Sequence, residues 1–154
     1  MTENTCFTIF DRIIEKHRLQ KIKTIGDAYM CASGLPFPNE NHAYKITLAA
    51  LEVVDFVKKA EEKSKLKIRV GINSGSVVAG VVGTKKFAYD IWGDAVNVAS
   101  RMESSGAENR VNISESTYNL IKDKAEFTFE FRGEIEAKGK GKVNMYFVDK
   151  VDLA

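Results

Sequence analysis

The stretch KIKTIGDAYMCAS, residues 21–33, decides the fold. Apolar and polar side chains alternate up to Ile25, and a second strand-like run begins at Ala28. Gly26 and Asp27 lie between the two runs, and this pair tolerates the positive φ angles of a two-residue turn. The segment therefore predicts a β-hairpin that carries Asp27 at its tip.

Amphipathic helices are predicted on both sides of this hairpin. Residues 5–17 have apolar side chains at helical spacing, and residues 42–64 continue the same pattern over a longer stretch. The loop between hairpin and second helix, residues 34–41, holds both prolines. Two later helices are predicted at 93–106, which ends on a glycine, and at 114–123, which begins with a serine.

The remaining segments read mostly as strands. They are predicted at residues 65–73, 76–83, 87–92, 110–114, 126–133 and 143–150. Residues 136–142, EAKGKGK, predict a flexible basic loop. Because strands and helices mix without strict alternation, the sequence predicts the α+β class, with a largely antiparallel sheet and helices packed on one face.

Composition limits the function classes. A chain of 154 residues fits one domain, and a net charge of +2 gives no general attraction to nucleic acid or to an anionic membrane. Cys6 and Cys31 form neither a metal-ligand spacing nor a disulfide framework, which favours a reducing, cytoplasmic setting. The apolar stretches are too short to span a bilayer, and no signal peptide opens the chain.

Three features carry chemistry. A carboxylate at a hairpin tip, as at Asp27, projects from rigid backbone and suits a hard cation. Asn97 and Arg101 are four residues apart and lie on one helical face, where an amide and a guanidinium suit a ribose oxygen and a phosphate. Lys138 opens a lysine–glycine run that can approach an anion. Arg69 lies in a predicted strand. Taken singly, each feature is more typical of an ordinary turn or polar surface.

Together these features resemble the catalytic domains of the class III nucleotidyl cyclases. The resemblance is carried by KIKTIGDAYM at 21–30, SGLP at 33–36, IRVGINSGSVVAGVVG at 68–83, YDIWGDAVNVASRME at 89–103 and FRGEIEAKGKGK at 131–142, in the family's order over nearly the whole chain. It implies a ferredoxin-like sheet with helices on one face. It also implies a head-to-tail homodimer in which both subunits build each active site.

The resemblance assigns a role to each candidate residue. Two aspartates of the family hold two Mg²⁺ (or Mn²⁺) ions, and Asp27 resembles the second of them. Arg69 resembles the arginine that contacts the nucleotide phosphates from the same subunit. The opposite subunit would supply the residues that read the base (Lys23 and Asp90), orient the ribose and stabilise the transition state (Asn97 and Arg101) and bind the triphosphate (Lys138). The implied reaction converts ATP to cyclic 3′,5′-AMP and pyrophosphate.

The choice of ATP over GTP depends on two side chains. Adenine presents an N6 donor and an N1 acceptor, which suit the carboxylate of Asp90 and the ammonium of Lys23. Guanine reverses this pattern, and the family's guanylyl members typically carry glutamate and cysteine at these positions. We therefore expect an adenylyl cyclase, although the flanking GDAYM, ASGLP and ASRMES resemble guanylyl members. Guanylyl cyclase remains an alternative.

One family motif is missing from the sequence. The family opens with a strand that bears the first metal-binding aspartate, in a phenylalanine–aspartate–isoleucine–x–glycine–phenylalanine motif, and Asp11 lies in a predicted helix instead. We expect residues 1–154 to be a single cyclase domain that lacks this strand at its N-terminus. A non-catalytic half that completes a partner's site is a second alternative. A membrane anchor or a regulatory domain outside this chain stays open.

Overall fold

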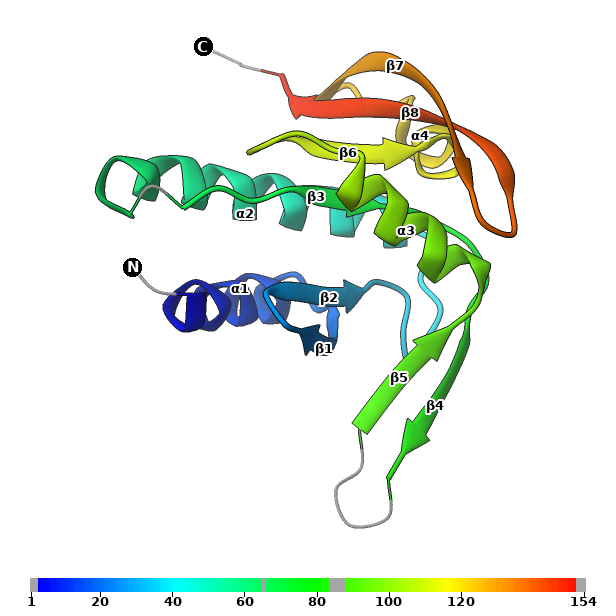
Figure 1. Cartoon of the computed structure of the whole chain (residues 1–154), viewed down its shortest axis with the longest axis horizontal. Helices are drawn as coiled ribbons and strands as arrows, with labels where there is room; N and C mark the ends of the chain where they lie inside the picture. Colours follow the sequence, from blue (N-terminus) through cyan, green and yellow to red (C-terminus); the bar gives the residue numbers. More distant parts are fainter. Residues whose placement is uncertain (1–2, 65, 84–87, 152–154) are drawn as a thin grey trace.

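The computed structural model describes residues 3–64, 66–83 and 88–151 (Figure 1). The elements are α1 (Glu3–Lys16), β1 (Gln20–Ile25), β2 (Ala28–Ala32), α2 (His42–Ser64), β3 (Val70–Ile72), β4 (Val78–Val82), β5 (Ala88–Trp92), α3 (Asp94–Ser104), β6 (Val111–Ser114), α4 (Glu115–Ile121), β7 (Phe127–Ala137) and β8 (Gly141–Lys150). The α+β class is confirmed. Phe87, where the sequence predicts the start of a strand, lies outside the described residues.

The largest sheet has four strands in the order β3-β6-β8-β7. Strand β3 runs parallel to β6, whereas β8 pairs antiparallel with both β6 and β7. Val111 and Ile113 of β6 point to one face, where they are buried with Ile72 against α2 and α4. This face holds one of the hydrophobic clusters of the molecule.

Helix α3 packs on the opposite face of the same sheet. Asn112, which lies between Val111 and Ile113, points to this side and donates to the carbonyl of Met102 at 2.9 Å. Met102 is fully buried and packs with Val98 and Met145. Helices thus cover both faces of the four-stranded sheet, not the single face that the sequence predicts, because β6 is apolar on one side and packs against α3 on the other.

The hairpin of β1 and β2 forms its own two-stranded sheet, and β4 and β5 form another. The sequence analysis predicts one sheet, whereas the described residues form three separate sheets. Strand β2 pairs only with β1, and β3 pairs only with β6. In Figure 1 the hairpin and α1 lie below β3, on the side away from β6. Helix α1 packs through Phe10 and Ile14 on α2 and β2.

The basic segment 136–142 is more ordered than its composition suggests. Strands β7 and β8 pair as far as Ala137 and Gly141, which leaves a turn of only three residues. Gly139 and Gly141 adopt φ angles of 85° and 73°, which favour glycine. The prediction of a flexible loop was wrong, because the glycines permit a tight turn. Lys138 is held at the tip of a long hairpin.

Two further strand boundaries differ from expectation. Of the strand predicted at 65–73, residue 65 lies outside the described residues, and among the others only Val70–Ile72 forms a strand, so Arg69 lies just before it. Strand β7 continues to Ala137 beyond the predicted end at residue 133. Among the described residues, no helix is both long enough and apolar enough to cross a membrane.

Candidate functional site

Lys23 and Asp90 meet where two separate hairpins approach each other. Lys23 follows an irregularity in β1, and its ammonium lies 2.9 Å from Oδ2 of Asp90 on β5. The other carboxylate oxygen accepts a hydrogen bond from the backbone N–H of Ile91 at 2.8 Å. The Lys23 ammonium and the Ile91 N–H together hold the pKa of Asp90 below its usual value. Asp90 therefore stays ionised and acts as an acceptor at neutral pH.

Asn97 and Arg101 both point outward from α3, as the four-residue spacing predicts. The helix begins at Asp94, one residue after Gly93, which has a φ of 130° and separates it from β5. A single continuous segment thus carries Asp90 and the two helical candidates. This short connection limits how far the helix can move relative to the strand.

The tip of the β7–β8 hairpin lies against the same helix. Nε of Arg101 donates to the backbone carbonyl of Glu136 at 3.2 Å, two residues before Lys138. A Cβ added to Gly139 would lie 2.5 Å from the Oδ1 atom of Asp94. The hairpin therefore contacts α3 at two places, at Asp94 in the first turn and at Arg101 in the last turn.

Asp27 and Arg69 lie elsewhere on the chain. Asp27 is exposed at the tip of the β1–β2 hairpin, next to Gly26 with its φ of 58°. Arg69 is exposed and its Nη1 donates to the carbonyl of Ser104, at the C-terminal end of α3, at 3.4 Å. The structure joins Lys23 to Asp90, Arg101 to the Lys138 turn, and Arg69 to the C-terminal end of α3. Asp27 lies in the same hairpin as Lys23.

The acidic side chains of the described residues do not gather into a metal site. Within the described part of the chain, no group of three or more histidine, cysteine, aspartate and glutamate side chains could hold a metal ion. Asp11 accepts a hydrogen bond from the Tyr29 hydroxyl at 2.6 Å and pairs with Lys21 at 2.9 Å. Burial opposes ionisation of Asp11, but these two donors lower its pKa overall. Asp27 is one exposed carboxylate, so the described residues do not fit a complete two-metal site.

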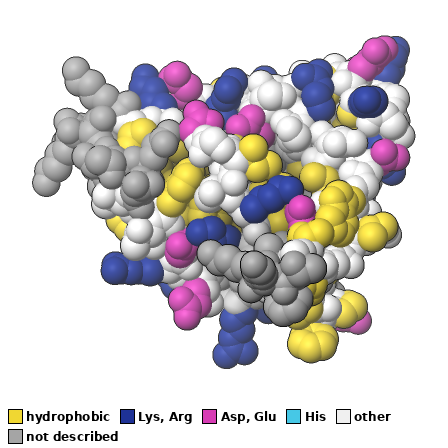
Figure 2. Space-filling view, turned by 60° about the horizontal axis from the view of Figure 1, so that its bottom comes forward, with side chains coloured by type: hydrophobic (Ala, Val, Ile, Leu, Met, Phe, Trp, Pro, Cys, Tyr) yellow, Lys and Arg dark blue, Asp and Glu magenta, His cyan; other side chains and the backbone are white. Residues whose placement is uncertain are grey.

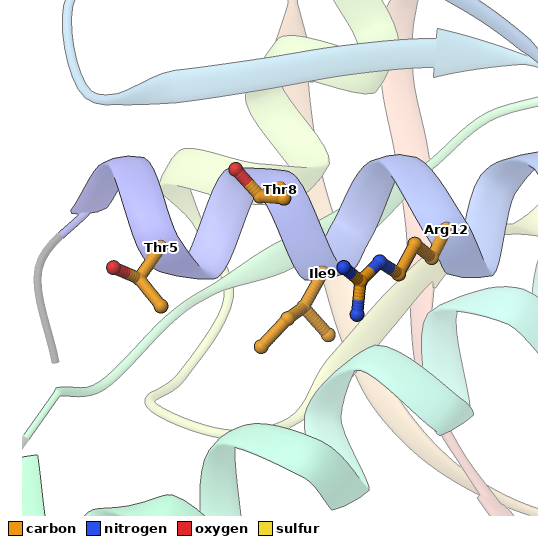
Figure 3. Close-up of a pocket in the computed structure, with 4 residues that line it drawn as sticks. All are labelled: Thr5, Thr8, Ile9 and Arg12. Atoms are coloured by element: carbon orange, nitrogen blue, oxygen red, sulfur yellow. The ribbon is translucent and has the colours of Figure 1, made fainter.

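Two of the hollows on the described surface lie near helices α3 and α1. One, of about 450 Å³, lies between the loop after β3, the start of α3 and the β7–β8 hairpin, and its lining includes Asn73, Asp94, Ser116 and Lys140. The other, of about 390 Å³, lies along α1 and is lined by Thr5, Thr8, Ile9 and Arg12 (Figure 3). The linings of both lack the seven candidate residues. Lys23 and Asp90 are half-buried, and the other five candidates are exposed.

An apolar surface adjoins the Lys23–Asp90 pair. Val78 and Val82 of β4 and Trp92 of β5 are exposed on the face of this two-stranded sheet that also carries Asp90, Val78 by 67% and Trp92 by 43%. Figure 2 shows hydrophobic side chains gathered on this face beside basic and acidic ones. We call these three residues the β4–β5 apolar patch. A patch of this kind on a charged surface is typical of an interaction site.

Sequence reasoning did not find Asn73. Its side chain donates to the carbonyl of Ala95 in α3 at 2.9 Å and accepts from Ser114 and Ser116 at 2.6 and 2.9 Å. A polar amide directly after the apolar strand Val70–Ile72 was the available signal. Its partners lie more than 20 residues away, so the sequence pattern gave no indication of them.

Comparisons with known proteins identify the family of the chain. Residues 2–150 match the model of the adenylate and guanylate cyclase catalytic domain. A receptor-type guanylate cyclase of Caenorhabditis elegans is 42% identical over 149 residues, covering 94% of this chain and 12% of that protein. An adenylate cyclase of Mycobacterium bovis is 39% identical over 144 residues, covering 92% of this chain and 32% of that protein. The chain thus spans less than a third of the length of these relatives.

The fold also matches solved structures of cyclase catalytic domains. The guanylate cyclase domain of a Catenaria anguillulae protein in complex with GTP superimposes with a TM-score of 0.85 at 37% identity, covering 96% of this chain and 81% of that one. An adenylyl cyclase from P. aeruginosa superimposes with a TM-score of 0.88 at 28% identity, covering 97% and 81%. The catalytic core of a rhodopsin-guanylyl cyclase with converted specificity, in complex with ATPαS, superimposes with a TM-score of 0.86 at 37% identity, covering 96% of this chain and 80% of that one. The chain belongs to the family of adenylate and guanylate cyclase catalytic domains.

Proposed function

We propose that residues 1–154 are the catalytic domain of an adenylyl cyclase, which converts ATP to cyclic 3′,5′-AMP and pyrophosphate. The observation that carries this proposal is the contact between Lys23 and Asp90. Relatives at similar identity include both adenylate and guanylate cyclases, and similar cores bind GTP or ATPαS. The fold therefore accepts either base, and the side chains that face the base must select it.

The pair presents the pattern that adenine requires. Asp90 is an ionised acceptor whose two oxygens each already have one donor, and each oxygen keeps a further lone pair for the N6 amino group. Lys23 has three N–H donors, and Asp90 takes one of them. The adenine N1 acceptor can take another. Guanine would place its O6 acceptor against the carboxylate and its N1–H donor against the ammonium, which leaves polar groups unpaired.

The remaining candidates fit the chemistry of ring closure. The ribose 3′-oxygen forms a bond to the α-phosphorus, the bond to the bridging oxygen of pyrophosphate breaks, and the 3′-hydroxyl loses its proton. We assign Asn97 to orient the ribose and Arg101 to stabilise charge on the phosphate in the transition state. Lys138 would bind the triphosphate as a point charge. Its position on a tight hairpin turn supports this role, because a rigid support lowers the entropic cost of binding.

A second copy of the chain is the partner we propose, arranged head to tail. We assign Asp27 and Arg69 to one half of the site and the other five candidates to the half that the second subunit supplies. The β4–β5 apolar patch lies beside Asp90 and is an exposed surface that the second subunit would bury. We propose that the domain acts in the cytoplasm, where ATP is available. Receptor-type relatives place the same kind of domain in larger proteins.

Cyclases of this family generally use two divalent metal ions. We propose Asp27 as one Mg²⁺ or Mn²⁺ ligand, although the described residues do not fit the full site. This incomplete site favours one alternative: a non-catalytic half that lends Lys23, Asp90, Asn97, Arg101 and Lys138 to a partner. The retained Asp27 argues against it, because a complementary half has no need of a metal ligand.

Side-by-side turnover of ATP and GTP tests the proposal. The chain should be assayed with Mn²⁺, both as it stands and extended by the aspartate-bearing strand of the family motif. We expect cyclic AMP, with kcat/KM for ATP well above that for GTP. A GTP preference would overturn our interpretation of Lys23 and Asp90. Turnover only after addition of a different cyclase subunit would favour the non-catalytic half.

A further inference from the structure

Asn73 connects three elements through one side chain. It directly follows β3, and its amide nitrogen donates to the carbonyl of Ala95 in the first turn of α3. Its amide oxygen accepts from the hydroxyls of Ser114 and Ser116, at the start of α4. Asn73 is therefore bonded to both neighbouring helices, from the end of the sheet.

The orientation of the Asn73 amide is fixed by its partners. The amide nitrogen faces the Ala95 carbonyl, which can only accept, so a flipped amide would place two oxygens against each other and lose this hydrogen bond. The surrounding hydroxyls are themselves held. The Ser116 Oγ atom lies 2.9 Å from the carbonyl oxygen of Ser74 and 2.9 Å from the Asn73 amide oxygen, so its one hydrogen is shared between these two acceptors, and Ser74 bonds to Thr117 at 2.8 Å. A satisfied network of this kind keeps a single geometry.

The residue that Asn73 holds lies between the candidate site residues. Ala95 is five positions after Asp90 and two before Asn97, on the continuous segment that joins β5 to α3. The loop after Asn73 also lies close to this turn, because a Cβ on Gly75 would lie 3.2 Å from the Cβ of Ala95. The far half of α3 has a separate attachment, the hydrogen bond from Asn112 to Met102.

We infer that Asn73 is a positioning residue that sets the first turn of α3, and with it the direction in which Asn97 faces the nucleotide. This inference rests on the proposed function for its catalytic consequence. The fixation of the turn itself is independent of any activity. Loss of the Asn73 amide would release the N-terminal turn, while Asn112 keeps the remainder of the helix in place.

Two substitutions at Asn73 separate its donor from its acceptor. Asn73→Asp keeps an oxygen for the two serines but places a second oxygen against the Ala95 carbonyl. Asn73→Ala removes both functions. Thr47→Ala is the control for general destabilisation, because Thr47 is fully buried and donates only within α2, to the carbonyl of Ala43. Thermal unfolding of all three variants allows them to be compared at similar stability.

Two measurements on these variants test the inference. We expect both Asn73 variants to lose kcat for ATP by about 10- to 100-fold with KM changed by less than about 3-fold, because misplacement acts mainly on the transition state. Amide hydrogen exchange at Val96 and Asn97, whose N–H groups donate to Gly93, should become faster by about 10-fold while exchange at Ser105 stays within about 2-fold. Thr47→Ala should show neither change.

The outcomes separate this inference from the proposed function. If the unsubstituted chain turns over neither nucleotide in either form, the proposed function fails, and the exchange measurement alone decides the role of Asn73. Exchange at Val96 and Asn97 that is unchanged, or raised equally along the whole chain, would overturn the inference. So would a loss of kcat no greater than that of the Thr47→Ala control.

Discussion

The ammonium of Lys23 and the carboxylate of Asp90 lie 2.9 Å apart although 67 positions separate the two residues in the chain. The β1–β2 hairpin supplies one and the β4–β5 hairpin the other. These hairpins belong to different sheets, so the ion pair is one of the contacts that join them. This ion pair therefore holds β1 against β5 and also joins the two residues that we assign to base recognition.

Replacement of both Lys23 and Asp90 should reverse the preference for adenine over guanine. The double substitution Lys23→Glu with Asp90→Cys removes the ammonium and the carboxylate that suit adenine and installs the residues typical of guanylyl members. We expect the ratio of kcat/KM for GTP over ATP to rise by at least about 100-fold, because mismatched polar groups discriminate strongly. Lys23→Glu alone should lose activity with both nucleotides, since it places two carboxylates side by side. An unchanged ratio in the double variant would remove these residues from base selection.

The same pair predicts a dependence of stability on pH. The pKa of Asp90 in the folded chain lies below its ordinary value of 3.8, chiefly through the hydrogen bond from Lys23. Folding therefore favours the ionised form, so the stabilisation is complete above the unfolded value and is lost as the pH falls through the folded value. The difference in unfolding free energy between the wild type and Asp90→Asn should be constant from about pH 5 to 8 and shrink below about pH 4.

Urea denaturation at several pH values measures this difference. Asp123→Asn, at an exposed position after α4, is the control for removal of one surface carboxylate. A difference between the wild type and Asp90→Asn that grows as the pH falls would contradict the assignment.

The sequence was sufficient for most of the local structure. Helix α2 has the predicted bounds of 42–64, and the turn at Gly26 and Asp27 forms as expected, because amphipathic spacing and turn residues are local signals. The division into three sheets was not predicted, since strand pairing depends on residues distant in the chain. The tight turn at Lys138 was also missed, because lysines alternating with glycines are equally typical of a flexible loop.

The candidate site was predictable in part. The resemblance to known cyclases selected Lys23 and Asp90, and the structure places them in contact. Helical spacing placed Asn97 and Arg101 on one exposed face. The hydrogen bond from Arg101 to the Glu136 carbonyl and the network at Asn73 were not foreseen, because both join segments more than 20 residues apart. The catalytic roles of all these residues stay predictions.

Asn97→Ala tests the transition-state assignment. The side chain is exposed on α3, so the substitution removes a polar contact without creating a cavity. We expect kcat for ATP to fall by about 10²- to 10³-fold while binding of a non-reactive ATP analogue changes little. Asn119→Ala, at an exposed position of α4, is the matched control and should retain full turnover. A variant at Asn97 that keeps most of its turnover would refute the assignment.

Close packing of α3 on β3 predicts a sharp difference between two glycines. A Cβ on Gly71 would collide with the backbone of Glu103 and lie 2.5 Å from the carbonyl carbon of Met102, and backbone atoms cannot move aside as a side chain can. Gly71→Ala should lower the unfolding free energy by about 1–3 kcal/mol or more. A Cβ on Gly80 would make only ordinary contact, 3.6 Å from the Trp92 ring. Gly80→Ala should therefore change the unfolding free energy by less than about 0.5 kcal/mol. Equal effects in urea denaturation would show that α3 does not pack this closely.

Mixing two inactive chains tests whether each site is shared between subunits. In a head-to-tail dimer, one site uses Asp27 of the first chain with Arg101 of the second, and the other site uses the reverse combination. Asp27→Ala and Arg101→Ala should therefore each be inactive alone. Mixed dimers keep one intact site, because the Arg101→Ala chain still supplies Asp27 and the other chain still supplies Arg101.

Random pairing makes half of the dimers mixed, so an equal mixture should recover about a quarter of the wild-type activity. The assay requires a form of the chain that turns over ATP, and subunits must be exchanged by co-expression or by refolding together. A mixture of Asp27→Ala with Asn97→Ala should recover activity to the same extent, because Asn97 and Arg101 belong to the same half of the site. By contrast, Asn97→Ala mixed with Arg101→Ala should stay inactive, because each site of every dimer then lacks either Asn97 or Arg101. Recovery in that last mixture, or none in the first two, would exclude the shared site.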